Sequence, residues 1–203
     1  MVPYVASGVL ACAGLAVLLP RIPLSTDPPA LERKTLYAAM IALAVWLVVT
    51  QQRVPGAWPG AQLWWTGVTV TLAAVYDHQA RVIPNRLLAL TSAGFLITAL
   101  VMAPARVGGL LLSCVALLLA MVGMAAIGRG GLGAGDVKLV AFLGLALGLR
   151  ASILAASAGF LAMGIPSIYH VLFGKGRKHT LPYAPFLWAG MLVWLLLGGT
   201  AML

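Results

Sequence analysis

The stretch GLGAGDVKL, residues 131–139, places an acidic side chain at the start of an apolar segment. The whole chain has four carboxylate side chains, those of Asp27, Glu32, Asp77 and Asp136. An ionisable group at the edge of a bilayer, or inside it, costs up to about 2.5 to 3.5 kcal/mol, so its presence there indicates a function. Asp77 also ends an apolar segment, and we expect the fold to bring it together with Asp136.

The composition is that of an integral membrane protein. Of 203 residues, 62% are hydrophobic and 8% are charged, and the mean hydropathy is +1.03. A water-soluble core of this size has no room for so much apolar surface. The net charge of +9 comes from basic residues spread through the connections between apolar runs. There they contact lipid headgroups, so we expect membrane lipids as partners and no nucleic acid.

Apolar runs separated by proline, glycine or charge predict an all-α, polytopic membrane protein with about eight transmembrane helices. No connection is long enough for a separate soluble domain, which predicts a single transmembrane domain over residues 1–203. Two of the runs, 36–50 and 136–150, are short for a full crossing. The predicted helices are 4–20, 36–50, 61–77, 87–104, 107–128, 136–150, 151–173 and 183–203.

Lysine and arginine are distributed unevenly among the connections. The odd-numbered connections carry ten of them and the even-numbered ones three, and the positive-inside rule then places the odd connections in the cytoplasm. Asp77 ends the third predicted helix and Asp136 begins the sixth, so both belong to odd connections. We therefore expect a multi-pass protein of the inner (cytoplasmic) membrane with both acids facing the cytoplasm.

Two carboxyl groups in a low-dielectric site share a proton when they lie within hydrogen-bond reach of each other. One then acts as base toward a water molecule and the other as acid toward a carbonyl oxygen, as in aspartic proteases. Asp77 lies at a predicted helix C-terminus, whose dipole disfavours negative charge, and Asp136 lies at a helix N-terminus, whose dipole favours it. We therefore expect Asp77 to hold the proton in the resting pair.

Each acid also has an ordinary structural interpretation. Asp77 is equally well explained as a loop acid paired with Arg81, in a tight turn that Pro84 and Asn85 close before the next helix. Asp136 is explained as an N-cap after a flexible glycine-rich loop. That loop lacks the lysine and serine of a phosphate-binding loop, and no strand precedes it. The three histidines do not form a ligand set by their spacing, so we predict no metal.

Three motifs follow one another along the chain, and together they are specific. They are YDHQARVIPNRL at 76–87, GAGDVKL at 133–139 and PYAPFL at 182–187. This order resembles the type IV prepilin peptidases, a branch of the GxGD intramembrane aspartyl proteases, over roughly residues 60–203. The resemblance implies a peptidase core there, preceded by two additional N-terminal helices within residues 1–59.

The resemblance also implies an activity and a site. The enzyme would remove the short basic leader of a type IV pilin-like precursor on the cytoplasmic side, just before the precursor's hydrophobic helix, and would need no cofactor. Asp77 and Asp136 match the catalytic pair. The motif positions predicted to support the substrate or the active site are Gly133, Gly135, Lys138, Pro84, Asn85 and Pro185.

Lys138, two residues after Asp136, has three possible roles. It either holds Asp136 in its charged form or contacts the substrate, or it simply extends to the lipid headgroups. Glycine-rich backbone before Asp136 gives an extended substrate segment space to lie beside the acid.

The sequence departs from the family pattern at two places. Ala184 stands where the family commonly has glycine, a small change that leaves a tight turn possible. The first cytoplasmic connection is short and has no cysteine, whereas bifunctional members carry a larger insertion there, often with paired zinc ligands. In this respect the chain resembles the short peptidases of tight-adherence (Flp-type) pilus systems, and an N-methyltransferase activity is not supported.

Two functions of other classes remain open at this stage. A proton-coupled transporter or channel would use Asp77 and Asp136 as relay sites, since intramembrane acids also mark ion paths. An inactive assembly factor would bind pilin without cutting it. The three differ in what replacement of either acid by asparagine does to precursor cleavage and to proton flux.

Overall fold

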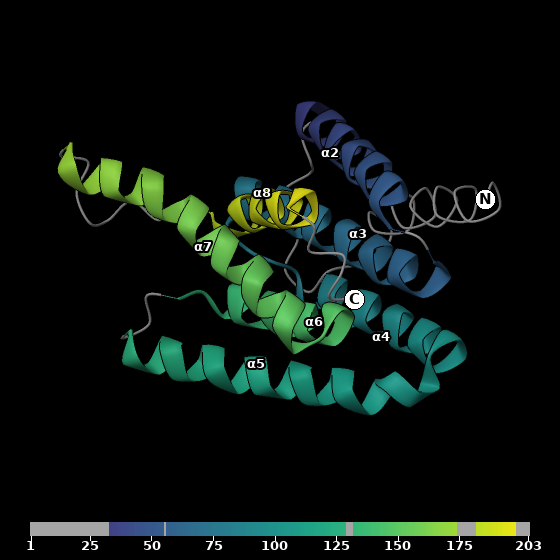
Figure 1. The fold of residues 1–203 in the computed structure, drawn as a ribbon. Helices are drawn as coiled ribbons and strands as arrows, with labels where there is room; N and C mark the ends of the chain where they lie inside the picture. Colours follow the sequence, from purple (N-terminus) through teal and green to yellow (C-terminus); the bar gives the residue numbers. More distant parts are fainter. Residues whose placement is uncertain (1–32, 55, 129–131, 174–181, 198–203) are drawn as a thin grey trace. The chain divides into compact units, whose positions relative to one another are not determined.

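The computed structural model describes residues 33–54, 56–128, 132–173 and 182–197, which belong to one compact unit, Leu31–Leu203. Every regular element in these ranges is helical, which confirms the all-α prediction (Figure 1). The predicted helix 4–20 lies outside the described residues. The elements are α2 (Arg33–Arg53), α3 (Ala57–Ala80), α4 (Asn85–Met102), the 3₁₀ turn η2 (Pro104–Arg106), α5 (Val107–Ile127), α6 (Ala134–Leu147), α7 (Leu149–Leu172) and α8 (Tyr183–Leu196).

The predicted segments from 36–50 onward correspond one to one to α2–α8, with shifted ends. α3 continues past its predicted end and stops at Arg81, whose left-handed φ of 55° turns the chain. The N–H of Arg81 donates to the Asp77 carbonyl oxygen at 3.1 Å, and Pro84, in an extended conformation, starts α4. Asp77 therefore lies within the last turn of α3.

Helix α6 is the buried centre of the described residues. α3, α4, α5 and α7 all pack against it, and every residue from Leu139 to Leu147 is buried. α6 has 14 residues, which is about 21 Å of helix against about 30 Å of bilayer hydrocarbon. Because protein rather than lipid surrounds this helix, its apolar length does not have to match the bilayer.

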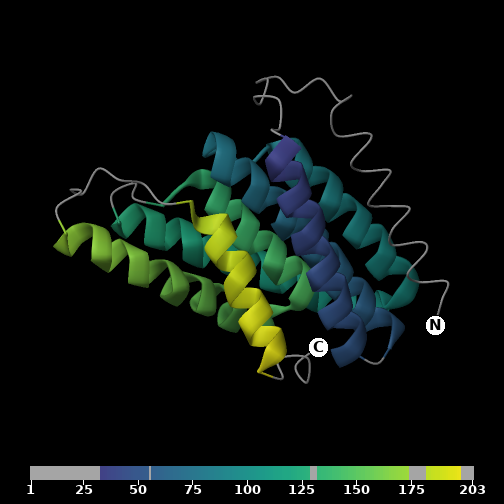
Figure 2. The same cartoon turned by 90° about the horizontal axis from the view of Figure 1, so that it is seen from above.

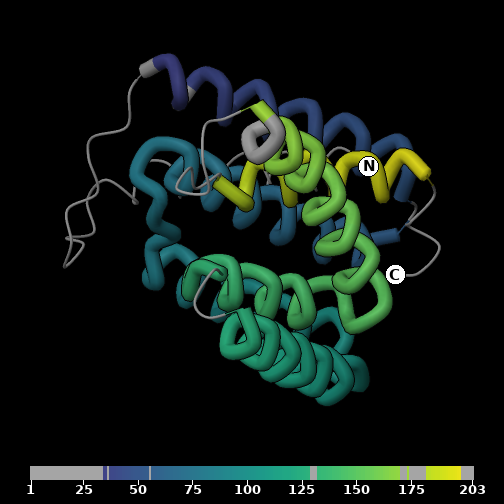
Figure 3. The backbone as a smooth tube through the Cα atoms, turned by 90° about the vertical axis from the view of Figure 1, so that its left-hand side faces the viewer, coloured from purple at the N-terminus to yellow at the C-terminus, as the bar shows by residue number. Residues whose placement is uncertain are grey.

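Glycines let the helices approach closely at two crossings. A Cβ atom on Gly144 of α6 would stand 2.7 Å from the carbonyl oxygen of Ser113 in α5. A Cβ on Gly190 of α8 would overlap the backbone nitrogen of Gly159 in α7. Small residues at helix crossings allow this backbone contact in membrane proteins. α5 consequently runs alongside α6, and α8 alongside α7 (Figures 2 and 3).

Three segments of the described residues are long and apolar enough to span a bilayer, judged by length and composition alone. They are Asn85–Met102, Pro104–Ile127 and Leu149–Tyr169, with mean hydropathies of 1.5, 2.7 and 1.7. Large apolar side chains cover their exposed faces, among them Leu112 at 70% exposure and Leu161 at 75%. Such faces are stable in lipid and not in water, as expected of a membrane protein. The total of eight spans stays a prediction.

Candidate functional site

Asp77 is buried in the last turn of α3, with 7% of its surface exposed. Its Oδ2 accepts a hydrogen bond of 3.0 Å from the main-chain N–H of Ala184, in the first turn of α8, and the N–H of Tyr183 is a second donor to the same carboxylate. The N-cap residue of α8, Pro182, supplies no side-chain cap. The N–H groups at the start of a helix need acceptors. Asp77, which belongs to α3, supplies the acceptor for the start of α8.

Asp136 lies in the first turn of α6. Its carboxylate reaches back and accepts a hydrogen bond from the N–H of Gly133, the N-cap residue, as the acidic residue of a capping box does. A Cβ atom on Gly133 would stand 3.1 Å from Asp136 Oδ2. The glycine before the acid thus leaves space for the carboxylate to fold back on the backbone.

The two acids interact. Both lie outside the three candidate spans. Burial, and after it the charge of Asp77, raises the pKa of Asp136 to about 6. Burial also raises the pKa of Asp77, while the Ala184 N–H and then the charge of Arg81 oppose that rise. The two acids are therefore near enough for the charge of Asp77 to act on Asp136. The Asp77 carboxylate has two main-chain donors, and that of Asp136 has one.

The turn after α3 joins the start of α6 through two contacts. A Cβ atom on Gly135 would stand 3.2 Å from Cβ of Ile83, so only glycine fits there without displacing that side chain. Lys138 Nζ donates a hydrogen bond of 2.8 Å to Asn85 Oδ1. Of the roles considered for Lys138, the structure shows this contact with the first residue of α4, made on the exposed surface.

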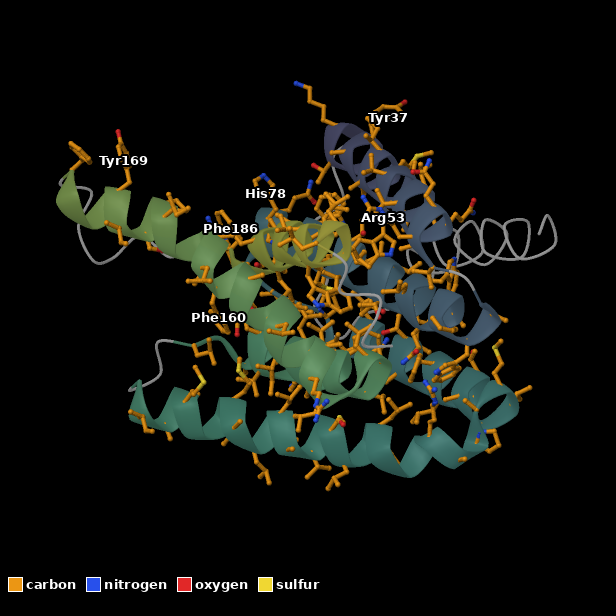
Figure 4. The ribbon with its side chains drawn as sticks, viewed as in Figure 1. Tyr37, Arg53, His78, Phe160, Tyr169 and Phe186 are labelled. Carbon is orange, nitrogen blue, oxygen red and sulfur yellow. The ribbon has the colours of Figure 1, made fainter. Side chains whose placement is uncertain are left out.

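The two prolines predicted to support the site lie in different places. Pro84 is the residue before α4 and sets the extended start of that helix. Pro185 lines an open, apolar groove of about 210 Å³ between α2, α3 and α8. His78, next to Asp77 in sequence, lines the same groove, and Figure 4 marks it together with Phe186 in the first turn of α8.

Tyr183 belongs to the site, although no role was predicted for it. Its side chain is 3% exposed and stacks on Phe160 of α7, with ring centroids 4.5 Å apart. Its hydroxyl donates to the carbonyl oxygen of Ala156 at 3.3 Å, and the phenol interacts electrostatically with Asp136. The main-chain N–H of Tyr183 thus contacts Asp77, and its ring lies near Asp136.

Gln62 is a second residue for which no role was predicted, and it lies outside the three motifs. It is buried in α3, and its Nε2 donates a hydrogen bond of 2.8 Å to the carbonyl oxygen of Ala146, near the end of α6. α3 and α6 are therefore joined at the ends opposite the acids. A buried amide within an apolar segment was the available signal, because such a group needs a partner.

Comparison with known proteins agrees with the motifs. Part of the chain is 35% identical to the prepilin leader peptidase/N-methyltransferase of Bacillus subtilis (strain 168), over 133 residues that make up 63% of this chain and 52% of that protein. The chain thus spans about half the length of this relative. No solved structure matches the chain.

A family model provides the second comparison. The model described as the type IV leader peptidase family matches residues 64–168, just over half of the chain. The matched segment contains both acids, together with the turn and the glycines that place them, whereas the PYAPFL motif lies beyond it. The chain therefore belongs to the type IV leader peptidase family.

Proposed function

We propose that the protein is a membrane-embedded aspartyl endopeptidase that removes the short basic leader from type IV pilin-like precursors. The single observation that supports it most is that the turn after Asp77 packs on the start of α6 beside Asp136, where a Cβ on Gly135 would stand 3.2 Å from Ile83. Asp77 and Asp136 are two of only four side-chain carboxylates in the chain. Family membership supports the class of reaction and of substrate. The short, cysteine-free first connection favours a precursor of the tight-adherence (Flp) type.

The two acids take different roles in this mechanism. Two N–H donors stabilise the charged form of the Asp77 carboxylate, whereas Asp136 has one such donor and its pKa is raised by burial and then by the charge of Asp77. Hydrogen bonds to a carboxylate favour its ionised state. Asp77 is therefore the base and Asp136 holds the proton, which reverses the order expected from the dipoles of α3 and α6 alone.

Hydrolysis then proceeds with a balanced exchange of protons. Asp77 takes a proton from water as the hydroxide oxygen bonds to the scissile carbonyl carbon, and Asp136 gives its proton to the carbonyl oxygen. When the C–N bond breaks, Asp77 returns its proton to the leaving amine nitrogen and Asp136 regains one from the hydroxyl group. Both acids finish in their starting protonation states, and no cofactor or metal takes part.

The remaining parts of the proposal concern placement. The distribution of basic residues supports a multi-pass protein of the inner membrane with the acids at the cytoplasmic face. The partners are the leader and hydrophobic helix of the precursor, together with membrane lipids, and no nucleic acid. Residues from about 60 to 203 form the peptidase core of a single membrane domain, to which residues 1–59 add two helices. N-methyl transfer is not part of the proposal.

The test uses the purified chain in detergent or lipid. A synthetic pilin-like precursor is added, and its cleavage is followed by gel shift. We expect wild type to cut it and both Asp77→Asn and Asp136→Asn to lose at least about 100-fold in rate. Asp27→Asn, which removes a carboxylate outside the three motifs, is the matched control and should keep activity.

Two other outcomes would replace the proposal. Proton flux into vesicles that depends on both acids, with no processing by wild type, would identify a transporter. Pilin binding that survives both substitutions, again without cleavage, would identify an assembly factor. Thermal unfolding of each variant shows whether a loss of activity is a loss of fold.

A further inference from the structure

The donors that bind Asp77 belong to the first turn of α8, 107 residues away along the chain. Their position depends on what holds that turn in place. The Tyr183 side chain is the first anchor, because it leaves α8 and packs into α7, where it stacks on Phe160 and donates to the Ala156 carbonyl oxygen. An aromatic pair of this geometry contributes about 0.5 to 1.5 kcal/mol beyond its buried area.

Further along, α8 is held against α7 by backbone contact. A Cβ on Gly159 would stand 2.8 Å from Cα of Leu187, and a Cβ on Gly190 would overlap the backbone of Gly159. The glycine contact fixes the body of α8, while Tyr183 fixes its first turn. The amides of Tyr183 and Ala184 are consequently aimed at Asp77 by α7, a helix that carries neither acid.

We propose that Tyr183 is a positioning residue of the acid pair: its ring, clamped against Phe160 of α7, holds the two α8 amides on Asp77 and so keeps Asp77 the ionised member. This role deepens the proposed peptidase function and rests on it. It involves the side chain of Tyr183 only as an anchor, and the atoms that touch Asp77 are main-chain N–H groups.

The charged and titratable groups around Asp77 decide what loosening the clamp does. His78 and Arg81 act on it from α3, and Asp136 is its neighbour from α6. The phenol of Tyr183, on α8, interacts with Asp136. When the amides withdraw, burial and the nearby Asp136 remain, so ionisation of Asp77 becomes less favourable. The pKa of the base then rises, and the acid limb of the pH–rate profile moves to higher pH.

The experiment compares the pH dependence of precursor processing in wild type, Tyr183→Leu, Tyr183→Phe and Phe160→Leu. Leucine keeps an apolar side chain of moderate size, so that the fold is retained. We expect Tyr183→Leu and Phe160→Leu to lose about tenfold in kcat, with the acid limb moved up by about one pH unit. Tyr183→Phe keeps the stacked ring and should stay within about threefold of wild type with an unmoved limb.

The chain offers a matched control in Tyr169→Leu. Tyr169 also forms an aromatic pair on α7, with Phe173 at 4.6 Å, but it is 57% exposed and lies near the end of that helix. An unmoved acid limb in Tyr183→Leu would overturn the clamp, as would a limb that moves equally in Tyr169→Leu. A loss in Tyr183→Phe equal to that in Tyr183→Leu would also overturn it, because the hydroxyl rather than the stacked ring would then matter.

A readout without catalysis separates the clamp from the proposed function. Infrared difference spectra of the carboxyl band, in a chain that carries Asp136→Asn, report the titration of Asp77 when compared with the Asp77→Asn/Asp136→Asn chain. We expect Tyr183→Leu to move the titration midpoint of Asp77 up by about one pH unit. The absence of such a shift would overturn the clamp. Should wild type fail to process any precursor while the shift is present, the function fails and the clamp stands.

Discussion

The carboxylate of Asp77, on α3, accepts a hydrogen bond of 3.0 Å from the main-chain N–H of Ala184, at the start of α8. An acid at the end of one helix thus caps the beginning of another. The contact satisfies N–H groups that would otherwise be unpaired in a buried place, and it stabilises negative charge on Asp77. Stability of α8 and acidity of Asp77 are therefore two consequences of one hydrogen bond.

The first prediction concerns the contact between α7 and α8. Gly159→Ala places a methyl group against the backbone of Leu187, so α8 must shift, at a cost of about 1 to 3 kcal/mol in stability. Because α8 carries the donors to Asp77, we expect processing to fall about tenfold or more. Gly164→Ala on the same helix meets nothing within 4 Å and is the control. Equal activity of the two variants would contradict the prediction.

The second prediction concerns Gly133, three residues before Asp136. Gly133→Ala sets a methyl group 3.1 Å from Asp136 Oδ2, which displaces the carboxylate from its hydrogen bond to the backbone. We expect a fall in kcat of about tenfold with little change in melting temperature. Gly123→Ala in α5, where the added methyl group has open space, should change neither. A variant with normal kcat would show that the carboxylate does not need this position.

The third prediction is a dependence of stability on pH. The pKa of Asp136 rises from 3.8 in the unfolded chain to about 6 in the fold, so between about pH 4 and pH 6 the native state binds more protons than the unfolded state. Stability must then fall as pH rises through this window and level off above it. The pKa of Asp77 is also raised in the fold, so its ionisation likewise lowers stability as pH rises.

Replacement of Asp136 tests whether stability falls as pH rises. At about pH 7.5, Asp136→Asn should melt a few degrees above wild type, because the cost of a buried charge is gone, and the gain should disappear below about pH 4. The measurement is thermal unfolding in detergent across this range, with Asp27→Asn as the control. A wild type that grows more stable from about pH 4 to about pH 6 would contradict the shift.

The fourth prediction concerns the bond from Lys138 to Asn85. The pair is exposed, so Lys138→Met and Asn85→Ala should each cost less than about 1 kcal/mol in stability. If the bond fixes α6 against the turn after α3, both should slow processing, and the double variant should be no slower than the worse single one. Lys34→Met, which removes an exposed lysine of α2, is the control. Fully additive losses would show that the two side chains act separately.

Most of the helical framework was predictable from the sequence. Apolar runs predicted α2 to α8 with ends displaced by at most four residues, apart from the predicted end of the last helix at 203, which lies outside the described residues. Proline, glycine and charge interrupt an otherwise apolar chain. The motifs also predicted Asp77 and Asp136 as a pair, and the charge of Asp77 acts on Asp136 in the fold. The assignment of these and the supporting residues to catalysis stays a proposal.

The order proposed for the two acids rests on contacts that local sequence does not report. A helix dipole acts on the acid that its own helix carries, and the dipoles of α3 and α6 alone favour the proton on Asp77. The decisive donors come from Tyr183 and Ala184, which reach Asp77 only after the chain has formed α7 and returned. No spacing rule reports a tertiary contact of that separation, and the same reason hid the roles of Tyr183 and Gln62.

The capping of α8 by Asp77 has a consequence for where this protein can be shortened. A fragment ending after α7 would retain both acids and the whole segment that the family model matches. It would nevertheless lack the amides that make one acid different from the other. The missing α8 contributes main-chain atoms rather than a reactive side chain. A separate peptide that begins at Pro182 should therefore restore the difference between Asp77 and Asp136.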